Sequence, residues 1–188
     1  TLSAKLDSES GQNHALEIVS GSGATAINGA TGTTRALGNL TINSSGTGAI
    51  TLSTVGADDA AGAAVMAIGN GDTSTLTLSG VDYHSGTSNQ TYTAASIDIN
   101  GADATFTTAA GGGNISFVGG ATGEIDVDDD VQGTSEGGLL IRTNGGDIDI
   151  EPQLIGESNN ANIDIGGVDF VENVVVTHTV YRISELLI

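Results

Sequence analysis

A short apolar–polar–apolar unit recurs along most of the chain and constrains its fold more than any other feature. Successive side chains of a β-strand point to opposite faces, so each unit predicts a very short strand with two inward residues. Clusters of glycine, asparagine, aspartate and serine, which favour turns, bound nearly every unit. The units are Leu16–Ile18, Leu40–Ile42, Ile50–Leu52, Leu76–Leu78, Ile97–Ile99, Ala104–Phe106, Ile115–Phe117, Ile125–Val127, Leu139–Ile141, Ile148–Ile150 and Ile163–Ile165.

Two features favour a parallel β-solenoid over an antiparallel β-sandwich or jelly roll. The later units begin at residues 104, 115, 125, 139, 148 and 163, and this spacing fits either architecture. The strands are, however, too short and the aromatic residues too few (three Phe, three Tyr, no Trp) for the wide core of a sandwich. The units also resemble one another, as stacked repeats do. We therefore expect an all-β solenoid, with the antiparallel sandwich or jelly roll as the alternative.

Two segments depart from the repeating pattern. Residues 58–68 are rich in alanine and predict either a turn or two of helix or a strand over 64–68. Residues 174–183 form a long β-branched run without glycine. We accordingly divide the chain into a repeat-built β domain, 1–173, and a terminal segment, 174–188.

The terminal segment has two interpretations. It is either the last rung of the solenoid, or an edge strand that pairs with a neighbouring copy, since long apolar edge strands promote association. In the second case the contacts would come from Val174, Val176, Val180 and Ile183. The expected partners are thus neighbouring rungs of a longer chain or other copies of this one.

Charge and composition exclude several classes of function. The chain has 4 Lys+Arg against 23 Asp+Glu, a net charge of −19, which repels nucleic acid and anionic membranes. It has no apolar run near the ~20 residues that a membrane helix needs, so we expect no membrane insertion. Because it has no cysteine, it can form neither disulfides nor thiolate metal sites.

The acidic residues suggest either a solvated surface or a calcium site. Glu17, Asp98, Asp126, Asp149 and Asp164 occupy the outward position of their units and would form an acidic ladder on stacked rungs. Four carboxylates fall within residues 126–130, and Ca²⁺ prefers such oxygen ligands. A structural calcium ion would therefore bind at Asp126, Asp128 and Asp130, although the spacing is not that of an EF-hand.

Enzymatic chemistry has little support in the sequence. The three histidines, His14, His84 and His178, are not part of a G-x-S-x-G or H-E-x-x-H motif. A carbohydrate-active enzyme would need two acids converging in a groove with a basic or aromatic wall, and this chain has few residues to build one. We expect no enzyme and no catalytic residue. The sequence also has four Asn-x-Ser/Thr motifs, which are possible glycosylation sites, at Asn39, Asn43, Asn89 and Asn114.

Residues 36–166 resemble the repeats of large bacterial surface proteins. The segment Leu37–Leu52, the Gln90–Tyr92 element, and the glycine-led rungs at 112–117 and 144–150 are similar to repeats of filamentous-haemagglutinin-like adhesins and giant β-strand-repeat proteins. The resemblance implies a right-handed parallel β-helix, a surface or secreted location, and a role in adhesion or as a scaffold. The glycine-free terminal segment departs from those repeats.

These observations predict a non-enzymatic, extracellular structural or adhesive module of a surface protein or fibre, with surface glycans as potential ligands. The first alternative is a self-assembling filament subunit joined through its C-terminal strand. The second is a carbohydrate-active β-helix enzyme with an outward acidic groove.

Overall fold

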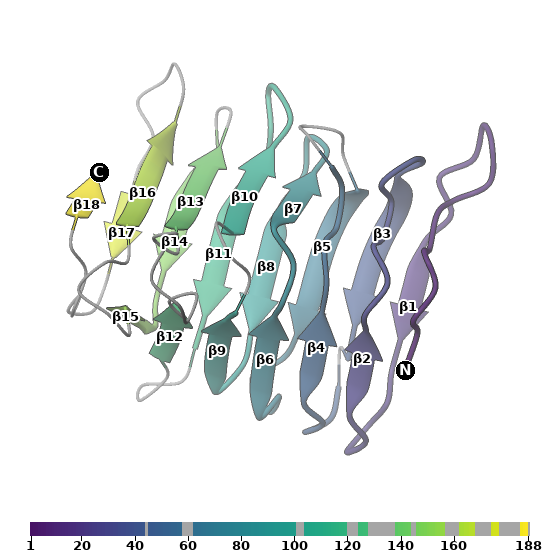
Figure 1. Cartoon of the computed structure of the whole chain (residues 1–188), viewed down its shortest axis with the longest axis horizontal. Helices are drawn as coiled ribbons and strands as arrows, with labels where there is room; N and C mark the ends of the chain where they lie inside the picture. Colours follow the sequence, from purple (N-terminus) through teal and green to yellow (C-terminus); the bar gives the residue numbers. More distant parts are fainter. Residues whose placement is uncertain are drawn as a thin grey trace, which may run out of the picture.

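The computed structural model is a parallel β-solenoid whose coils stack along the long axis of the molecule (Figure 1). It describes residues 1–43, 45–57, 62–100, 104–119, 124–127, 138–143, 146–156, 162–167, 174–176 and 185–187. Within these ranges every paired strand runs parallel to its neighbour, so the solenoid prediction is confirmed and the antiparallel alternative is wrong. No described residue lies in a helix that could cross a membrane.

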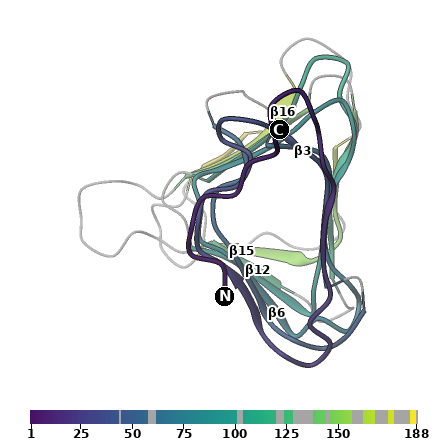
Figure 2. The same ribbon diagram turned by 90° about the vertical axis from the view of Figure 1, so that its right-hand side faces the viewer.

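The strands form three faces, which give the solenoid a triangular outline when viewed along its axis (Figure 2). Face A is β2 Thr25–Ile27, β4 Ile50–Leu52, β6 Thr75–Leu78, β9 Ser96–Ile99, β12 Glu124–Val127 and β15 Gln153–Gly156. Face B is β1 Leu16–Ile18, β3 Leu37–Ile42, β5 Ala63–Gly69, β8 Gln90–Thr93, β11 Ile115–Val118, β14 Ile148–Ile150 and β17 Val174–Val176. Face C is β7 Asp82–Ser85, β10 Ala104–Thr108, β13 Gly138–Thr143, β16 Asn162–Gly167 and β18 Glu185–Leu187.

Faces B and C belong to one twelve-stranded sheet that forks at β5. The start of β5 pairs with β7 through Ala63 and Ser85, and its end pairs with β8 through Met66 and Gln90. Before the fork, the long strands β3 and β5 each continue around the corner between face C and face B as one unbroken strand. After it, each coil has one strand on each of the three faces.

The core is a set of columns of inward side chains that run along the axis. On face A, Leu52, Leu78 and Ile99 succeed one another in register and are completely buried. On face B, the column of Ile42 continues through Ile68 to Tyr92. The alternation of buried and half-buried residues in most of the strands with described side chains confirms two inward residues per short unit.

The Ala-rich segment is a strand where the structure describes it. β5 covers Ala63–Gly69, and residues 58–61 lie outside the described part. Ala63, Met66 and Ile68 are buried, while the two residues between Ala63 and Met66 are only half-buried. This interruption of the two-residue period lies where β5 turns the corner, which explains why the sequence pattern was ambiguous there.

Four of the chain's six aromatic rings stack inside the solenoid beyond the fork. Tyr83 stacks on Phe106 with centroids 4.7 Å apart, and Tyr92 stacks on Phe117 at 5.1 Å. The two stacks meet edge to face, with the Phe106 and Tyr92 centroids 5.3 Å apart. Each stack joins register partners on successive coils, so the rings bind coil to coil as well as face B to face C.

Candidate functional site

The predicted acidic ladder is distributed over three faces instead of forming one line. Asp98 and Asp126 are register partners on β9 and β12 of face A. Asp149 lies on β14 of face B between Ser116 and Val175. Asp164 lies on β16 of face C, and Glu17 lies at the other end of face B on β1, opposite Thr41. Only Asp98 and Asp126 adjoin each other among these five residues, so the prediction of a single ladder is wrong.

Among the residues that the structure describes, the pair on face A is the one place where two of the predicted outward acids adjoin on neighbouring strands. Thr77 on β6 donates a hydrogen bond from its Oγ1 to Asp98 Oδ2, at 3.3 Å. Asp126 is half-buried in the strand that follows. Parallel strands are about 4.8 Å apart, so the two carboxylates share one small patch of surface. Among the described strands of face A, this is the one pair of register partners in which both side chains are acidic.

Only one of the three residues of the calcium hypothesis lies in the described part of the chain. Asp126 is described, whereas Asp128 and Asp130 lie outside the described residues. Within the described residues, no group of three or more His, Asp or Glu side chains is arranged to hold a metal ion. The calcium site therefore stays a prediction. Among the predicted assembly residues, Val174 and Val176 are in β17, and Val180 and Ile183 lie outside the described residues.

The two described histidines lie in unrelated surroundings. His14 is exposed on the first coil, with its Nε2 4.0 Å from Glu9 Oε2. His84 is buried in β7 of face C, and its Nδ1 contacts the hydroxyl of Thr107 on β10. His178 lies outside the described residues.

The four glycosylation motifs differ in accessibility. Asn39 and Asn89 are exposed and Asn114 is half-buried, but Asn43 is completely buried. Asn43 has a left-handed backbone, φ 52°, which asparagine tolerates better than most residues. Its Nδ2 donates to the carbonyl of Gly48 at 3.1 Å. A glycan cannot be carried by this nitrogen in the folded protein.

A buried polar network at the fork was not predicted from the sequence. Gln90 of β8 is fully buried, and its Nε2 donates to the carbonyl of Tyr83 at 3.1 Å and to the carbonyl of Thr107. Its Oε1 accepts a hydrogen bond from the Tyr92 hydroxyl at 2.9 Å. The Gln90 amide thus joins face B to face C at the point where their ladders separate. The sequence signal is the Gln90–Tyr92 element, which lies in the strand β8.

Burial changes the acidity of the two tyrosines in this network. Loss of water raises the pKa of Tyr83, although the Gly80 N–H bonded to its hydroxyl at 2.8 Å acts in the opposite direction. Burial also raises the pKa of Tyr92 well above the ordinary value of 10, and the neighbouring Tyr83 adds to this effect. Both hydroxyls are therefore neutral hydrogen-bonding groups of the core.

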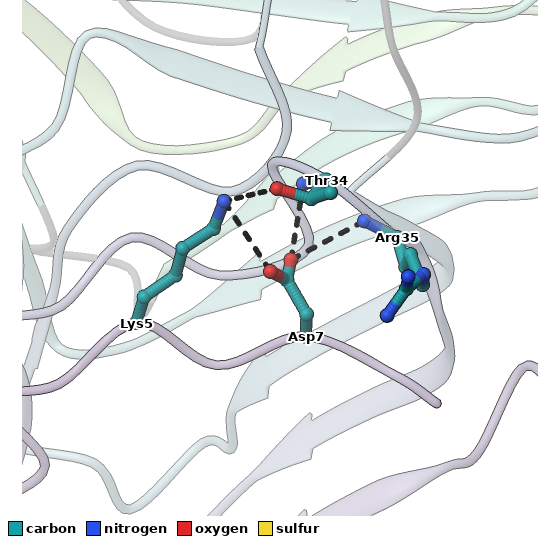
Figure 3. Close-up of polar contacts among 4 residues, drawn as sticks. All are labelled: Lys5, Asp7, Thr34 and Arg35. Atoms are coloured by element: carbon teal, nitrogen blue, oxygen red, sulfur yellow. Dashed lines mark hydrogen bonds and ion pairs between the residues drawn. The ribbon is translucent and has the colours of Figure 1, made fainter. Parts of the chain in front are cut away.

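Two of the chain's four basic residues, Lys5 on the first coil and Arg35 on the second, lie around Asp7 (Figure 3). Asp7 Oδ1 accepts hydrogen bonds from the backbone N–H groups of Thr34 at 3.0 Å and Arg35 at 3.3 Å. Lys5 Nζ lies 3.3 Å from Asp7 Oδ2 and also contacts the Thr34 hydroxyl. Burial opposes ionisation of Asp7, but these bonds and the Lys5 charge outweigh it and lower the pKa of Asp7. The cluster joins the first coil to the second.

Comparison with known proteins gives no relative from which a function can be transferred. No protein-family model, no curated protein and no solved structure matches the chain. The fold is therefore established from the strand pairing of this chain itself, as a parallel β-solenoid.

Proposed function

We propose that the protein is a non-enzymatic, extracellular structural or adhesive module that holds its two ends apart as a stiff rod. One observation carries the proposal: the parallel backbone ladders of the described strands continue in register from the first coil to β18. The N-terminus and C-terminus lie at opposite ends of the long axis (Figure 1). Each coil packs mainly against its two neighbours, as in other solenoids, so length and stiffness are the properties that this architecture supplies.

The polar outward side chains support the proposal that the module is exposed to water at a cell surface. Register partners on face A present Thr51, Thr77 and Asp98, and those on face B present Thr91, Ser116 and Asp149. Short hydroxyl and carboxylate groups on flat parallel strands offer hydrogen-bonding partners at regular spacing of about 4.8 Å. The outward surfaces of faces A and B therefore suit contact with the hydroxyl-rich glycans of a cell surface. The resemblance of residues 36–166 to adhesin repeats points in the same direction.

The experiment is a binding and turnover assay on a panel of acidic and neutral polysaccharides. We expect retention on a subset of immobilised glycans with no release of reducing ends or unsaturated products. Release of product that is abolished by Asp98→Asn or Asp126→Asn, but not by Asp149→Asn, would overturn the proposal. That result would favour the carbohydrate-active enzyme, because Asp98 and Asp126 are the adjacent carboxylate pair. Asp149→Asn is the matched control because it removes one outward charge from another face.

A further inference from the structure

The side-chain amide of Asn70 joins the turns of two successive coils. Its Nδ2 donates hydrogen bonds to the carbonyl oxygens of Asn43, at 2.6 Å, and Gly46, at 3.0 Å. These two carbonyls belong to the turn that follows β3, whereas Asn70 follows β5, the next strand along face B. The Asn70 amide therefore fastens its own turn to the turn of the preceding coil.

The same side chain is bent back over the peptide bond that follows it. Asn70 Oδ1 accepts a hydrogen bond from the backbone N–H of Asp72 at 2.8 Å. The ring that this bond closes contains the backbone nitrogen of Gly71, so one tight turn holds that nitrogen and Asn70 Cγ. The Thr73 hydroxyl accepts a hydrogen bond from the Asn70 N–H, and the Thr73 N–H donates to the Asn70 carbonyl, both at 3.0 Å. These two bonds fix both ends of the turn.

The residue between them, Gly71, is open to solvent and sterically unhindered. It is exposed, and a Cβ atom placed on it would meet nothing within 4 Å. In an Asn-Gly sequence the backbone nitrogen readily attacks the preceding side-chain amide, because glycine has no Cβ to crowd that nitrogen. Hydroxide can reach the Gly71 N–H and remove its proton.

We propose that Asn70 and Gly71 form a self-modification site, at which the Gly71 nitrogen attacks Asn70 Cγ and displaces the side-chain nitrogen as ammonia. Hydroxide takes the proton from the Gly71 nitrogen, whose electron pair then forms the bond to Cγ. The bond between Cγ and Nδ2 breaks as Nδ2 accepts a proton from water. The product is a five-membered succinimide. Water opens it at either carbonyl, which leaves aspartate or isoaspartate at position 70.

The groups around the Asn70 amide favour both stages of this reaction. Attack places negative charge on Oδ1, to which the Asp72 N–H already donates, as the donors of an oxyanion hole do. Departure of the nitrogen requires a protonated amine. The carbonyls of Asn43 and Gly46 accept its hydrogen bonds, and such bonds become stronger when the donor is charged. The folded turn therefore promotes the reaction.

Asn28 and Gly29, an Asn-Gly pair that the structure also describes in full, provide an internal control. Gly29 is buried, and its N–H donates to the carbonyl of Leu2 at 3.3 Å. A Cβ atom on Gly29 would lie 2.1 Å from the carbonyl oxygen of Ala4. The first coil thus covers the nitrogen that would have to attack, and we expect the fold to retard the reaction at Asn28.

Modification of Asn70 would cut the fastening between the two turns. Neither aspartate nor isoaspartate carries an N–H group on this side chain, so the carbonyls of Asn43 and Gly46 lose their donor and face a carboxylate. A slow and irreversible step thus turns an attractive contact between coils into a repulsive one. This inference does not depend on what the outer faces bind, so its failure would leave the proposed function untouched.

The first test compares the folded chain with the same chain unfolded in urea, both incubated at mildly alkaline pH. Peptide mapping by mass spectrometry measures the rate of modification at each asparagine. We expect the rate at Asn70 to be higher in the folded sample than in the unfolded one, and the rate at Asn28 to be lower. A rate at Asn70 that is equal or lower in the folded sample would overturn the proposal, because the bonds to the amide would then protect it.

The second test uses variants to separate the reaction from its structural effect. Gly71→Ala keeps the turn but crowds the attacking nitrogen, so it should slow modification of Asn70 and retain its Tm on incubation, whereas the parent loses Tm. Asn70→Asp should have the lowered Tm from the start. Asn28→Asp, which adds the same charge at an exposed position, should keep the Tm of the fresh parent. Equal Tm values for Asn70→Asp and the fresh parent would contradict the fastening role of the amide.

Discussion

At the scale of single residues, the buried amide of Gln90 joins two faces of the solenoid. This amide bonds to carbonyls of Tyr83 and Thr107 on face C and to the Tyr92 hydroxyl on face B. These groups lie where the twelve-stranded sheet forks. The backbone hydrogen bonds of one strand cannot pair with both branches at this point. A buried polar group without a hydrogen-bond partner is costly. The Gln90 side-chain amide therefore supplies the hydrogen bonds that the backbone ladder does not form at this point.

We predict that Gln90→Ala lowers the free energy of unfolding by about 2–4 kcal/mol. The change leaves several buried polar groups without hydrogen-bond partners, and each such group costs about 1–3 kcal/mol. The matched control is Thr91→Ala, whose outward, half-buried side chain follows Gln90 in the same strand. Its expected effect is within about 0.5 kcal/mol, as for ordinary surface substitutions. Urea titration measures both. Equal losses in the two variants would show that Gln90 does not join the faces.

The buried tyrosines predict how stability depends on alkaline pH. The folded-state pKa values of Tyr83 and Tyr92 are raised above the ordinary value of 10. Their contribution is therefore fully present below pH 10 and is lost as the pH rises above 10 towards the folded-state values. We expect the free energy of unfolding to fall over that range, and less steeply in the variant Tyr83→Phe with Tyr92→Phe. Early ionisation of both tyrosines in a protein that is still folded would contradict their burial.

At the scale of the strands, close stacking of coils requires glycine at particular turns. A Cβ atom on Gly48 would lie 2.1 Å from the carbonyl oxygen of Gly23 on the preceding coil. A Cβ on Gly71 would meet nothing within 4 Å. Both residues lie in the connections that precede strands of face A. The difference between them is that only Gly48 is in close contact with the preceding coil.

We predict that Gly48→Ala destabilises the protein by about 1–3 kcal/mol, as overpacking does, while Gly71→Ala changes stability by no more than about 0.5 kcal/mol. The difference arises because the two turns must separate to admit the methyl group at position 48. Thermal unfolding followed by circular dichroism compares the two. If Gly71→Ala were the more damaging change, the stacking of turns described for Gly48 would be wrong.

The strand pattern was predictable wherever the inward residues are apolar and alternate strictly. Units such as Ile50–Leu52 and Ile148–Ile150 are strands with the predicted bounds. β7 and β8 were not predicted as strands, because their inward positions include the polar residues Ser85 and Gln90. Polar inward residues are stable there because the fork supplies carbonyl and hydroxyl partners, which include the carbonyls of Ser88, Tyr83 and Thr107. Such partners are set by tertiary structure and leave no local periodicity in the sequence.

For the candidate site, the sequence predicted the outward direction of the acidic residues but not which of them meet. That depends on the number of residues in each turn, which decides the face to which a unit belongs. Asp98 and Asp126 therefore adjoin on face A, whereas Asp149 falls on face B.

At the scale of the whole molecule, the calcium hypothesis predicts a ligand-dependent stability. An ion bound to the folded state alone adds about 2.7 kcal/mol at one hundred times its Kd, so Ca²⁺ should raise the Tm and EDTA should lower it. Asp126→Asn should reduce this shift, while Asp149→Asn, an outward acid on face B, should leave it unchanged. A Tm that is indifferent to both Ca²⁺ and EDTA would count against the site at Asp126, Asp128 and Asp130.

The central claim is that the coils stack in parallel and in register, and cysteine pairs test it most directly because the chain has no cysteine of its own. Thr51 and Thr77 are register partners on β4 and β6, whereas Asp98 is one strand further along face A. Adjacent parallel strands are about 4.8 Å apart, within the separation of about 4.4–6.8 Å between Cα atoms that a disulfide spans. Thr51→Cys with Thr77→Cys should therefore form an intramolecular disulfide on mild oxidation of the folded protein. Thr51→Cys with Asp98→Cys, two strand spacings apart, should not, and the reverse result would contradict the solenoid.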